Sequence, residues 1–204
     1  LLDRPEGMMA RDIIQAEDRA AFARSARPIY ANSQNVAGRL KKYLGLPSTP
    51  LYHPPPLADR LTQGDFGDYL FAPGRLNPSK RVDLMLRALA KVPGPLRLVI
   101  AGVPENPAYL VELRNLAAAL GVSGRVDWLG GIDNETMIRY YAEARAVVFT
   151  PQDEDLGYIT LEAMLCGKPV ITTTDAGGPL EFISHKREGL ITPPDIEALS
   201  QAFA

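Results

Sequence analysis

The sequence predicts an α/β protein with a Rossmann-like parallel sheet and helices on both faces of the sheet. From about residue 66 onward, short apolar runs rich in β-branched residues alternate with amphipathic segments of helical period. Strands separated by helices of this length pair in parallel through right-handed crossovers. The 204 residues, 46% of them hydrophobic, suffice for one full domain core and a smaller piece.

The predicted elements follow one another in a regular order after residue 66. The strands are short apolar runs, over residues 69–73, 96–102, 125–129, 146–150, 169–173 and 189–192. The helices that follow them are predicted to begin at Lys80, Pro107, Asn134, Leu161 and Pro194. In the first helix, the apolar residues recur at i, i+3, i+4 and i+7, which indicates one buried face: Val82, Met85, Leu86 and Leu89.

The first 60 residues have a different pattern. A helix is predicted over residues 12–24, a short strand over 28–31, and a second helix from Ser33 to near Gly45. Three consecutive prolines, residues 54–56, then form a stiff extended segment that is typical of a linker. We therefore divide the chain into residues 1–60 and residues 61–204.

Two carboxylates follow the strand at residues 146–150, with seven residues between them. If Glu154 and Glu162 both lay on a helix, they would be about 12 Å apart. The paired carboxylates of glycosidases are only about 5–9.5 Å apart, so these two suit anchors for different ends of one long polar ligand. Gly157 allows close backbone approach, and the amides of a helix start favour an anion. The alternative is an acidic first turn that complements the helix dipole, with Glu162 solvated.

A basic pair follows the strand at residues 69–73. Arg75 comes directly after Pro73-Gly74, and Lys80 stands five residues later at the predicted helix start. Cations at a helix N-terminus oppose the macrodipole, so Lys80 and Arg81 are unfavourable there unless an anion binds. Both side chains suit phosphate, Arg as a planar fork and Lys as a point charge. The alternative is that these are solvated surface residues.

Together, in this order, the two segments resemble the G-R-x(4)-K and E-x(7)-E motifs of retaining glycosyltransferases of family 4, which have the GT-B fold. The resemblance covers residues 28–204 in outline. It implies that Arg75 and Lys80 hold the donor diphosphate, that Glu154 holds the transferred sugar, and that these three residues carry catalysis. It also implies a contact between Glu162 and the ribose. Backbone groups are implied in donor binding at five further positions: Gly131, Ile132, Leu156, Gly157 and Tyr158.

The sequence departs from the family pattern at the first glutamate. Asp155 follows Glu154 where many members have glycine, and Leu156 takes a position that is usually aromatic. This variant resembles some mannosyltransferase-type members, and it leaves the hexose of the donor open. The segment Gly177-Gly178-Pro179 resembles the family's glycine-rich loop, although a simple turn into a helix explains it equally well.

Composition excludes several other classes of function. The net charge of −2 argues against a nucleic-acid-binding protein, which normally has a basic face. A single cysteine and two distant histidines offer no metal-ligand spacing, so no metal site is expected. The G-x-G-x-x-G and G-x(4)-G-K-[ST] fingerprints of dinucleotide and P-loop proteins are absent from the sequence. No apolar run reaches the 18 or so residues that a membrane span needs.

The resemblance implies the donor-binding half of a hexosyltransferase that needs no metal and no other cofactor. The expected donor is a nucleoside-diphosphate sugar, such as GDP-mannose or a UDP-sugar, and the acceptor is a glycan or lipid-linked molecule in polysaccharide biosynthesis. We expect a cytoplasmic protein, either free or in peripheral contact with the inner face of the membrane. Both ends resemble cuts from a longer protein, so we expect residues 1–60 to be the remnant of an acceptor-side domain and the fragment to be inactive. Two alternatives remain, a non-catalytic nucleotide-sugar-binding module and a sugar-nucleotide epimerase of the same fold.

Overall fold

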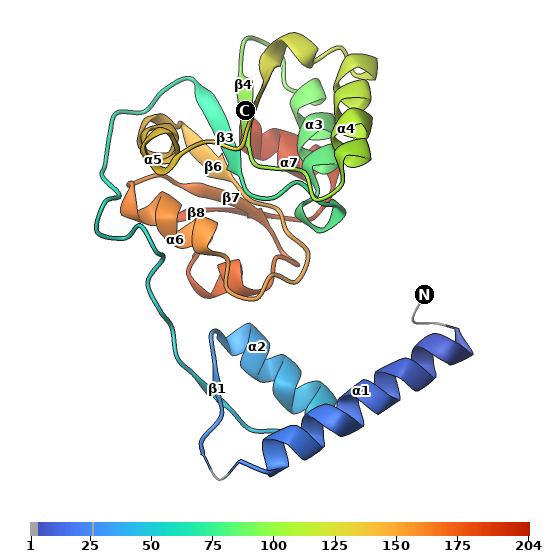
Figure 1. Ribbon diagram of the computed structural model, residues 1–204. Coiled ribbons are helices and arrows are strands. Elements are labelled where there is room, and N and C mark those ends of the chain that lie inside the picture. Colours follow the sequence, from blue (N-terminus) through green and yellow to red (C-terminus); the bar gives the residue numbers. More distant parts are fainter. Residues whose placement is uncertain (1–3, 26) are drawn as a thin grey trace. The chain divides into compact units, whose positions relative to one another are not determined.

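The computed structural model describes residues 4–25 and 27–204. The chain forms two compact units, Leu1–His53 and Pro54–Ala204 (Figure 1). The division predicted after residue 60 lies inside the second unit, because Arg60 forms an ion pair with Glu135 of that unit. The three prolines at residues 54–56 therefore open the second unit.

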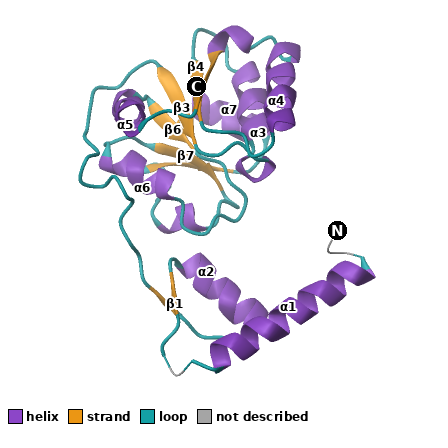
Figure 2. Cartoon of the chain, viewed as in Figure 1, coloured by secondary structure: helices purple, strands orange, loops and turns teal. Residues whose placement is uncertain are grey.

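The first unit is built from helices and one pair of very short strands (Figure 2). Ser33 caps the second helix, since its hydroxyl accepts a hydrogen bond of 3.0 Å from the amide of Val36. The first helix begins earlier than predicted, at Pro5, because proline suits the first helical position. The elements are α1 (Pro5–Ala23), β1 (Tyr30–Ala31), α2 (Gln34–Arg39), the π-helix η1 (Leu40–Leu44) and β2 (Thr49–Pro50), with β1 and β2 parallel.

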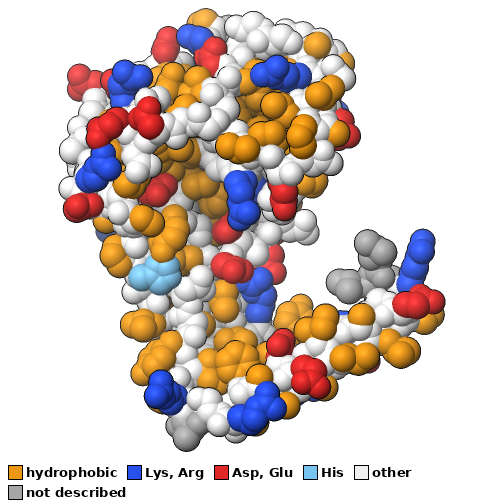
Figure 3. All heavy atoms as spheres, in the orientation of Figure 1, with side chains coloured by type: hydrophobic (Ala, Val, Ile, Leu, Met, Phe, Trp, Pro, Cys, Tyr) orange, Lys and Arg blue, Asp and Glu red, His pale blue; other side chains and the backbone are white. Residues whose placement is uncertain are grey.

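The helix α1 exposes apolar side chains, which Figure 3 shows as hydrophobic atoms along its length. The large ones among them are Met8, Met9, Ile13 and Ile14. The Arg19 guanidinium of α1 donates to the carbonyls of Tyr43 and Leu44 in the π-helix η1. No helix in the described part of the chain is long and apolar enough to cross a membrane.

The second unit contains a six-stranded sheet in which every neighbouring pair of strands is parallel, in the order β5-β4-β3-β6-β7-β8. All six predicted strands are present. They are β3 (Tyr69–Pro73), β4 (Arg97–Ala101), β5 (Val126–Gly130), β6 (Ala146–Val148), β7 (Val170–Thr173) and β8 (Gly189–Thr192). The α-helices are α3 (Val82–Lys91), α4 (Pro107–Ala119), α5 (Asn134–Glu143), α6 (Tyr158–Leu165) and α7 (Ile196–Phe203). Short 3₁₀ helices are η2 (Pro78–Lys80), η3 (Ser123–Arg125) and η4 (Gly178–Glu181).

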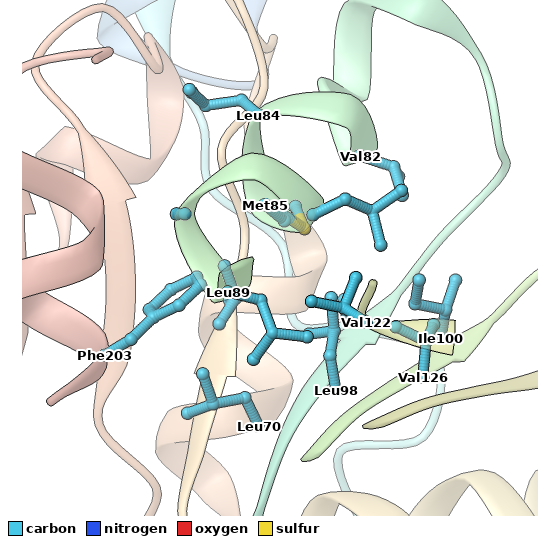
Figure 4. Close-up of a cluster of buried hydrophobic side chains, with 14 of the residues drawn as sticks. Leu70, Val82, Leu84, Met85, Leu89, Leu98, Ile100, Val122, Val126 and Phe203 are labelled. Carbon is cyan, nitrogen blue, oxygen red and sulfur yellow. The ribbon is translucent and has the colours of Figure 1, made fainter. Parts of the chain in front are cut away.

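Helices cover both faces of this sheet, as predicted (Figure 1). Successive residues of β3 point to opposite faces, so Leu70 packs with α3, α4 and α7, whereas Phe71 packs with α5 and α6. Figure 4 shows the first of these two cores, in which the predicted stripe of α3 meets the sheet. The fully buried strands explain why their sequences are continuous apolar runs.

Three helix starts in the second unit differ from the sequence-based expectation. The helix α7 begins at Ile196, two residues after the predicted Pro194, and Asp195 is its N-cap. Lys80 lies in the 3₁₀ turn η2 and α3 begins only at Val82, because Arg81 between them has a left-handed backbone with φ of 53°. The helix α6 begins at Tyr158 instead of Leu161, directly after Gly157. Glu154 therefore lies outside the helix, and the spacing of about 12 Å expected for two helical carboxylates does not apply to Glu154 and Glu162.

The strand order has a switch point between β3 and β6. From β3 the chain proceeds to β4 and β5 on one side, and it then returns to β6 on the other side of β3. In open parallel sheets, ligands bind at the carboxyl ends of the strands beside such a point. The loops that follow β3 and β6 are the segments that carry the two predicted motifs.

Candidate functional site

The loops at the carboxyl ends of β3, β4 and β5 are joined by backbone hydrogen bonds. The amide of Leu76 donates to the carbonyl of Val103 at 3.1 Å, and the amide of Gly102 donates to Gly130 at 2.7 Å. Gly102 must be a glycine here, because a Cβ atom on it would lie 1.8 Å from the carbonyl oxygen of Gly74. These contacts hold the loop of Arg75 against the next loop in the sheet.

On the other side of the switch point, the loops after β6 and β7 are joined in the same way. The amides of Asp153 and Glu154 donate to the carbonyls of Asp175 and Ala176, both at 2.9 Å. The amide of Gly178 returns a bond of 2.8 Å to the carbonyl of Glu154. These backbone hydrogen bonds fix Glu154 between the loops after β6 and β7, independently of its side chain.

The side chain of Glu154 forms an ion pair with Lys80, which comes from the loop after β3. The two residues are 74 positions apart in the sequence, and both side chains are largely buried, 23% and 20% exposed. The Lys80 ammonium also lies 5.4 Å from the centroid of the Phe149 ring. The structure thus brings one member of each predicted motif into direct contact across the switch point.

Arg81, which neither sequence motif assigns to the site, makes five side-chain hydrogen bonds in this region. Its guanidinium donates to both carboxylate oxygens of Asp175 at 2.8 Å. It also donates to the Thr150 and Pro151 carbonyls at 2.8 and 2.7 Å and to the Thr173 hydroxyl at 2.7 Å. The hydrogen bonds from Arg81 to the Asp175 carboxylate are the largest cause that holds the pKa of Asp175 below its ordinary value.

This arrangement corrects one step of the sequence-based reasoning. The sequence predicts that Lys80 and Arg81 need a bound anion, because cations oppose the dipole at a helix start. Glu154 and Asp175 supply that negative charge from within the protein. In the sequence, only its basic side chain next to Lys80 points to a role for Arg81. Its partner Asp175 is 94 positions away, so the sequence does not indicate their contact.

Arg75 differs from Lys80, although both belong to the same motif. Its side chain is exposed, directly after Gly74 at the end of β3. Within residues 4–25 and 27–204, no carboxylate forms an ion pair with it. Arg75 therefore presents an uncompensated charge at the carboxyl edge of the sheet.

The start of α6 is shaped by close contacts between two glycines and the neighbouring loop. Gly157 has φ of 82°, and a Cβ atom there would lie 2.8 Å from the Pro179 side chain. A Cβ atom on Gly178 would lie 2.3 Å from the carbonyl oxygen of Asp155. Leu156 and Gly157 directly precede the first residue of α6, Tyr158. The amides of a first helical turn have no acceptor within the helix, which makes such a segment suited to an anion.

Glu162 is not an ordinary solvated helix residue. The hydroxyl of Tyr141, a fully buried residue of α5, donates to one of its carboxylate oxygens at 2.6 Å. Burial raises the pKa of Glu162 above 4.5, and the hydrogen bond from Tyr141 lowers it in part. The alternative interpretation, in which Glu162 is a solvated surface residue, does not agree with this buried hydrogen bond.

The remaining predicted positions lie at the end of β5, on the far side of β4 and β3 from Glu154. Gly131 is exposed, and a Cβ atom there would lie 3.1 Å from the Val103 side chain. Ile132 packs partly against the core that contains Phe71. These residues could contact only the opposite end of a ligand that extends along the strand ends. Among the described residues, no three acidic, cysteine or histidine side chains are grouped to hold a metal ion.

Comparison with known proteins identifies the family. The family model of glycosyl transferases group 1 matches residues 64–204, which is more than half of the chain. The chain belongs to the group 1 glycosyltransferases. This result agrees with the resemblance found in the two motifs, and it covers both of them.

Two similar curated proteins are glycosyltransferases by name. The D-inositol 3-phosphate glycosyltransferase of Jonesia denitrificans is 33% identical over 134 residues, which cover 62% of this chain and 31% of that protein. The enzyme of the same name from Mycolicibacterium smegmatis is 35% identical over 125 residues, covering 60% of this chain and 29% of that protein. The chain thus spans about a third of the length of these relatives.

Solved structures share the fold of this glycosyltransferase chain. HepE from Anabaena, in complex with UDP and glucose, has a TM-score of 0.80 at 24% identity and covers 93% of this chain and 56% of its own. Sucrose-phosphate synthase from Thermosynechococcus elongatus has a TM-score of 0.81 at 23% identity, with coverage of 94% and 51%. These similarities confirm the predicted α/β fold of the GT-B type.

Proposed function

We propose that this chain is the C-terminal, donor-binding part of a retaining glycosyltransferase of family 4. The whole protein transfers a hexose from a nucleoside-diphosphate sugar to a glycan or lipid-linked acceptor. One observation carries the proposal: the loops after β3 and β6, which flank the switch point of the sheet, bring Lys80 and Glu154 into contact. A similar structure supports a nucleotide donor, since HepE was solved with UDP and glucose.

In this proposal, the positive charges act on the diphosphate. Arg75 and Lys80 neutralise the charge that develops on the leaving group, which is the electrostatic term that usually dominates such transfers. Because these side chains supply the positive charge, the proposal includes no metal ion or other cofactor. The exposed Arg75 reaches the diphosphate directly, whereas Lys80 approaches it from its ion pair with Glu154.

The two glutamates hold the two sugars of the donor. Glu154 accepts hydrogen bonds from the transferred hexose, next to the amides of Leu156, Gly157 and Tyr158. Glu162 accepts hydrogen bonds from the ribose. A carboxylate has about four acceptor sites, so the bond from Tyr141 leaves Glu162 able to accept more. Backbone groups of Gly131 and Ile132 contact the base.

Titration calorimetry with UDP, GDP and ADP tests the proposal and names the nucleotide. Arg75→Ala and Lys80→Ala should each weaken the preferred diphosphate about tenfold or more, since a charged hydrogen bond contributes about 1.5–3 kcal/mol and each decade is about 1.4 kcal/mol. The nucleoside alone should bind these variants and the parent equally weakly. Arg87→Ala, which removes an exposed charge from the middle of α3, is the matched control and should leave binding unchanged.

A second measurement concerns transfer. If residues 1–60 are only the end of an acceptor-side domain, the 204-residue chain should bind the donor without transferring sugar. Turnover by this chain with any acceptor would show that the acceptor site is included.

In the binding experiment, equal loss of nucleoside and diphosphate affinity in Arg75→Ala would contradict the phosphate assignment.

A further inference from the structure

Arg81 follows Lys80 in the sequence, but its side chain binds different partners, in the loops after β6 and β7. We infer that Arg81 is a positioning residue: it locks the loops after β6 and β7 onto the loop after β3 and so sets the relative placement of Lys80 and Glu154. This inference rests on the proposed function, because it concerns the same donor site. It assigns to Arg81 no direct contact with the ligand.

The hydrogen bonds of the guanidinium show that it is committed to the protein. The Nε atom and one terminal nitrogen donate to the carbonyls of Thr150 and Pro151 in the loop after β6. Both terminal nitrogens donate to the Asp175 carboxylate in the loop after β7. Only 18% of this side chain is exposed. Such a bidentate fork fixes the orientation of its partners as well as their distance, which a lysine cannot do.

The backbone of Arg81 supports the same conclusion. Its φ of 53° and ψ of 46° lie in the left-handed region, which is unfavourable for residues other than glycine. Such a conformation persists only where the surrounding structure over-determines it. Here the five hydrogen bonds of the side chain provide that constraint, at the junction between η2, which contains Lys80, and α3.

The contacts form a closed ring that includes the ion pair. Arg81 holds Asp175, and the carbonyl of Asp175 accepts a bond from the amide of Asp153. The next residue, Glu154, pairs with Lys80, which precedes Arg81 in the chain. Removing the Arg81 side chain opens this ring at one link and leaves the Lys80 and Glu154 side chains chemically intact.

Glycine provides a sharp test, because Arg81→Gly removes the side chain and keeps the left-handed backbone favourable. Binding of UDP, GDP and ADP is measured for Arg81→Gly, Arg81→Lys, Asp175→Asn and the double variant Arg81→Gly/Asp175→Asn. We expect the first and third to weaken the preferred diphosphate about tenfold, and the double variant to be no weaker than either single one. Arg81→Lys should recover only part of the loss. Asp127→Asn, which breaks the Arg97–Asp127 ion pair on β4 and β5, is the matched control.

Amide hydrogen exchange without ligand separates this inference from the proposed function. The Asp153 and Glu154 amides should exchange faster in Arg81→Gly and Asp175→Asn, whereas amides in β4 should not change. If the parent binds no nucleoside diphosphate, the proposed function fails, and the exchange rates still decide the role of Arg81. Binding within twofold of the parent by Arg81→Gly, or unchanged exchange at Asp153 and Glu154, would overturn the inference. Should Arg81→Gly not fold, Asp175→Asn provides the same test.

Discussion

Lys80 and Glu154 form an ion pair across the switch point of the sheet, although they belong to two separate motifs. The pair means that the ammonium and the carboxylate are not independent binding groups. A change at Glu154 alters the environment of Lys80, and a change at Lys80 removes a partner of Glu154. The effects of substitutions at this site should therefore depend on one another.

The first prediction separates the two glutamates by their ligands. Glu154→Gln should weaken the sugar nucleotide by about 1–3 kcal/mol, because it removes a charged acceptor for the hexose. The same variant should bind the diphosphate equally well or better, since Lys80 no longer shares its charge with a carboxylate. Glu162→Gln should weaken both ligands together. Calorimetry with UDP and UDP-glucose measures this crossover.

Equal losses for the two ligands in both variants would contradict the assignment of two anchors. The conservative change from carboxylate to amide preserves the shape of each side chain, so the comparison isolates charge. Circular dichroism of each variant provides the control for folding.

The second prediction concerns the pH dependence of stability at Glu162. Its pKa is raised in the folded protein, so the folded state holds this proton to a higher pH than the unfolded state does. The resulting stabilisation is present below pH 4.5 and is lost as the pH rises through the folded-state pKa. Glu162→Gln cannot ionise, and its amide oxygen can still accept the Tyr141 hydroxyl.

The melting temperature of Glu162→Gln relative to the parent should therefore rise between about pH 4.5 and pH 7. Glu112→Gln, which alters an exposed carboxylate on α4, serves as the control and should show no such trend. A difference that is constant over this range, or one that falls, would argue against the raised pKa.

The third prediction tests the contact between the glycine loop after β7 and the start of α6. Gly178→Ala would place a Cβ atom 2.3 Å from a backbone oxygen, so the loop must move. Overpacking of this kind costs about 1–3 kcal/mol, and the loss should be visible in urea unfolding. Gly124→Ala is the matched control, because a Cβ atom on Gly124 would have no other atom within 4 Å. Diphosphate affinity should fall in Gly178→Ala alone.

The fourth prediction concerns Lys168, a buried lysine at the turn before β7. Its ammonium donates to the carbonyls of Gly64 and Asp65 at 2.7 and 2.9 Å and lies 4.1 Å from the Phe66 ring centroid. Lys168→Met keeps an unbranched side chain but removes the ammonium and leaves both carbonyls without this donor, so we expect a loss of about 1–3 kcal/mol in unfolding free energy.

Lys186→Met alters an exposed lysine and should change stability by less than about 0.5 kcal/mol. If both variants unfold at the same urea concentration, the hydrogen bonds of Lys168 contribute nothing measurable. Diphosphate binding should be unaffected by Lys168→Met, because this lysine lies at the opposite end of the sheet from the donor site.

The sequence by itself determined the elements of the second unit and where polar groups follow its strands. Alternation between apolar runs and helical periodicity is a local property, so the strands from residue 69 to residue 192 could be predicted within one or two residues. The spacing within each motif is also local, which is why Arg75 with Lys80 and Glu154 with Glu162 could be proposed as pairs. The left-handed turn at Arg81 had no such signal, and the start of α3 was placed too early.

Only the tertiary structure decided which groups meet. The order of the strands placed β3 beside β6, and this brought Lys80 to Glu154 and Arg81 to Asp175, over separations of 74 and 94 residues. It likewise placed the hydroxyl of Tyr141 on Glu162. Each strand is a similar apolar run, so its sequence does not encode its neighbour. Pairing depends on how all the helices pack on both faces together, which no local pattern records.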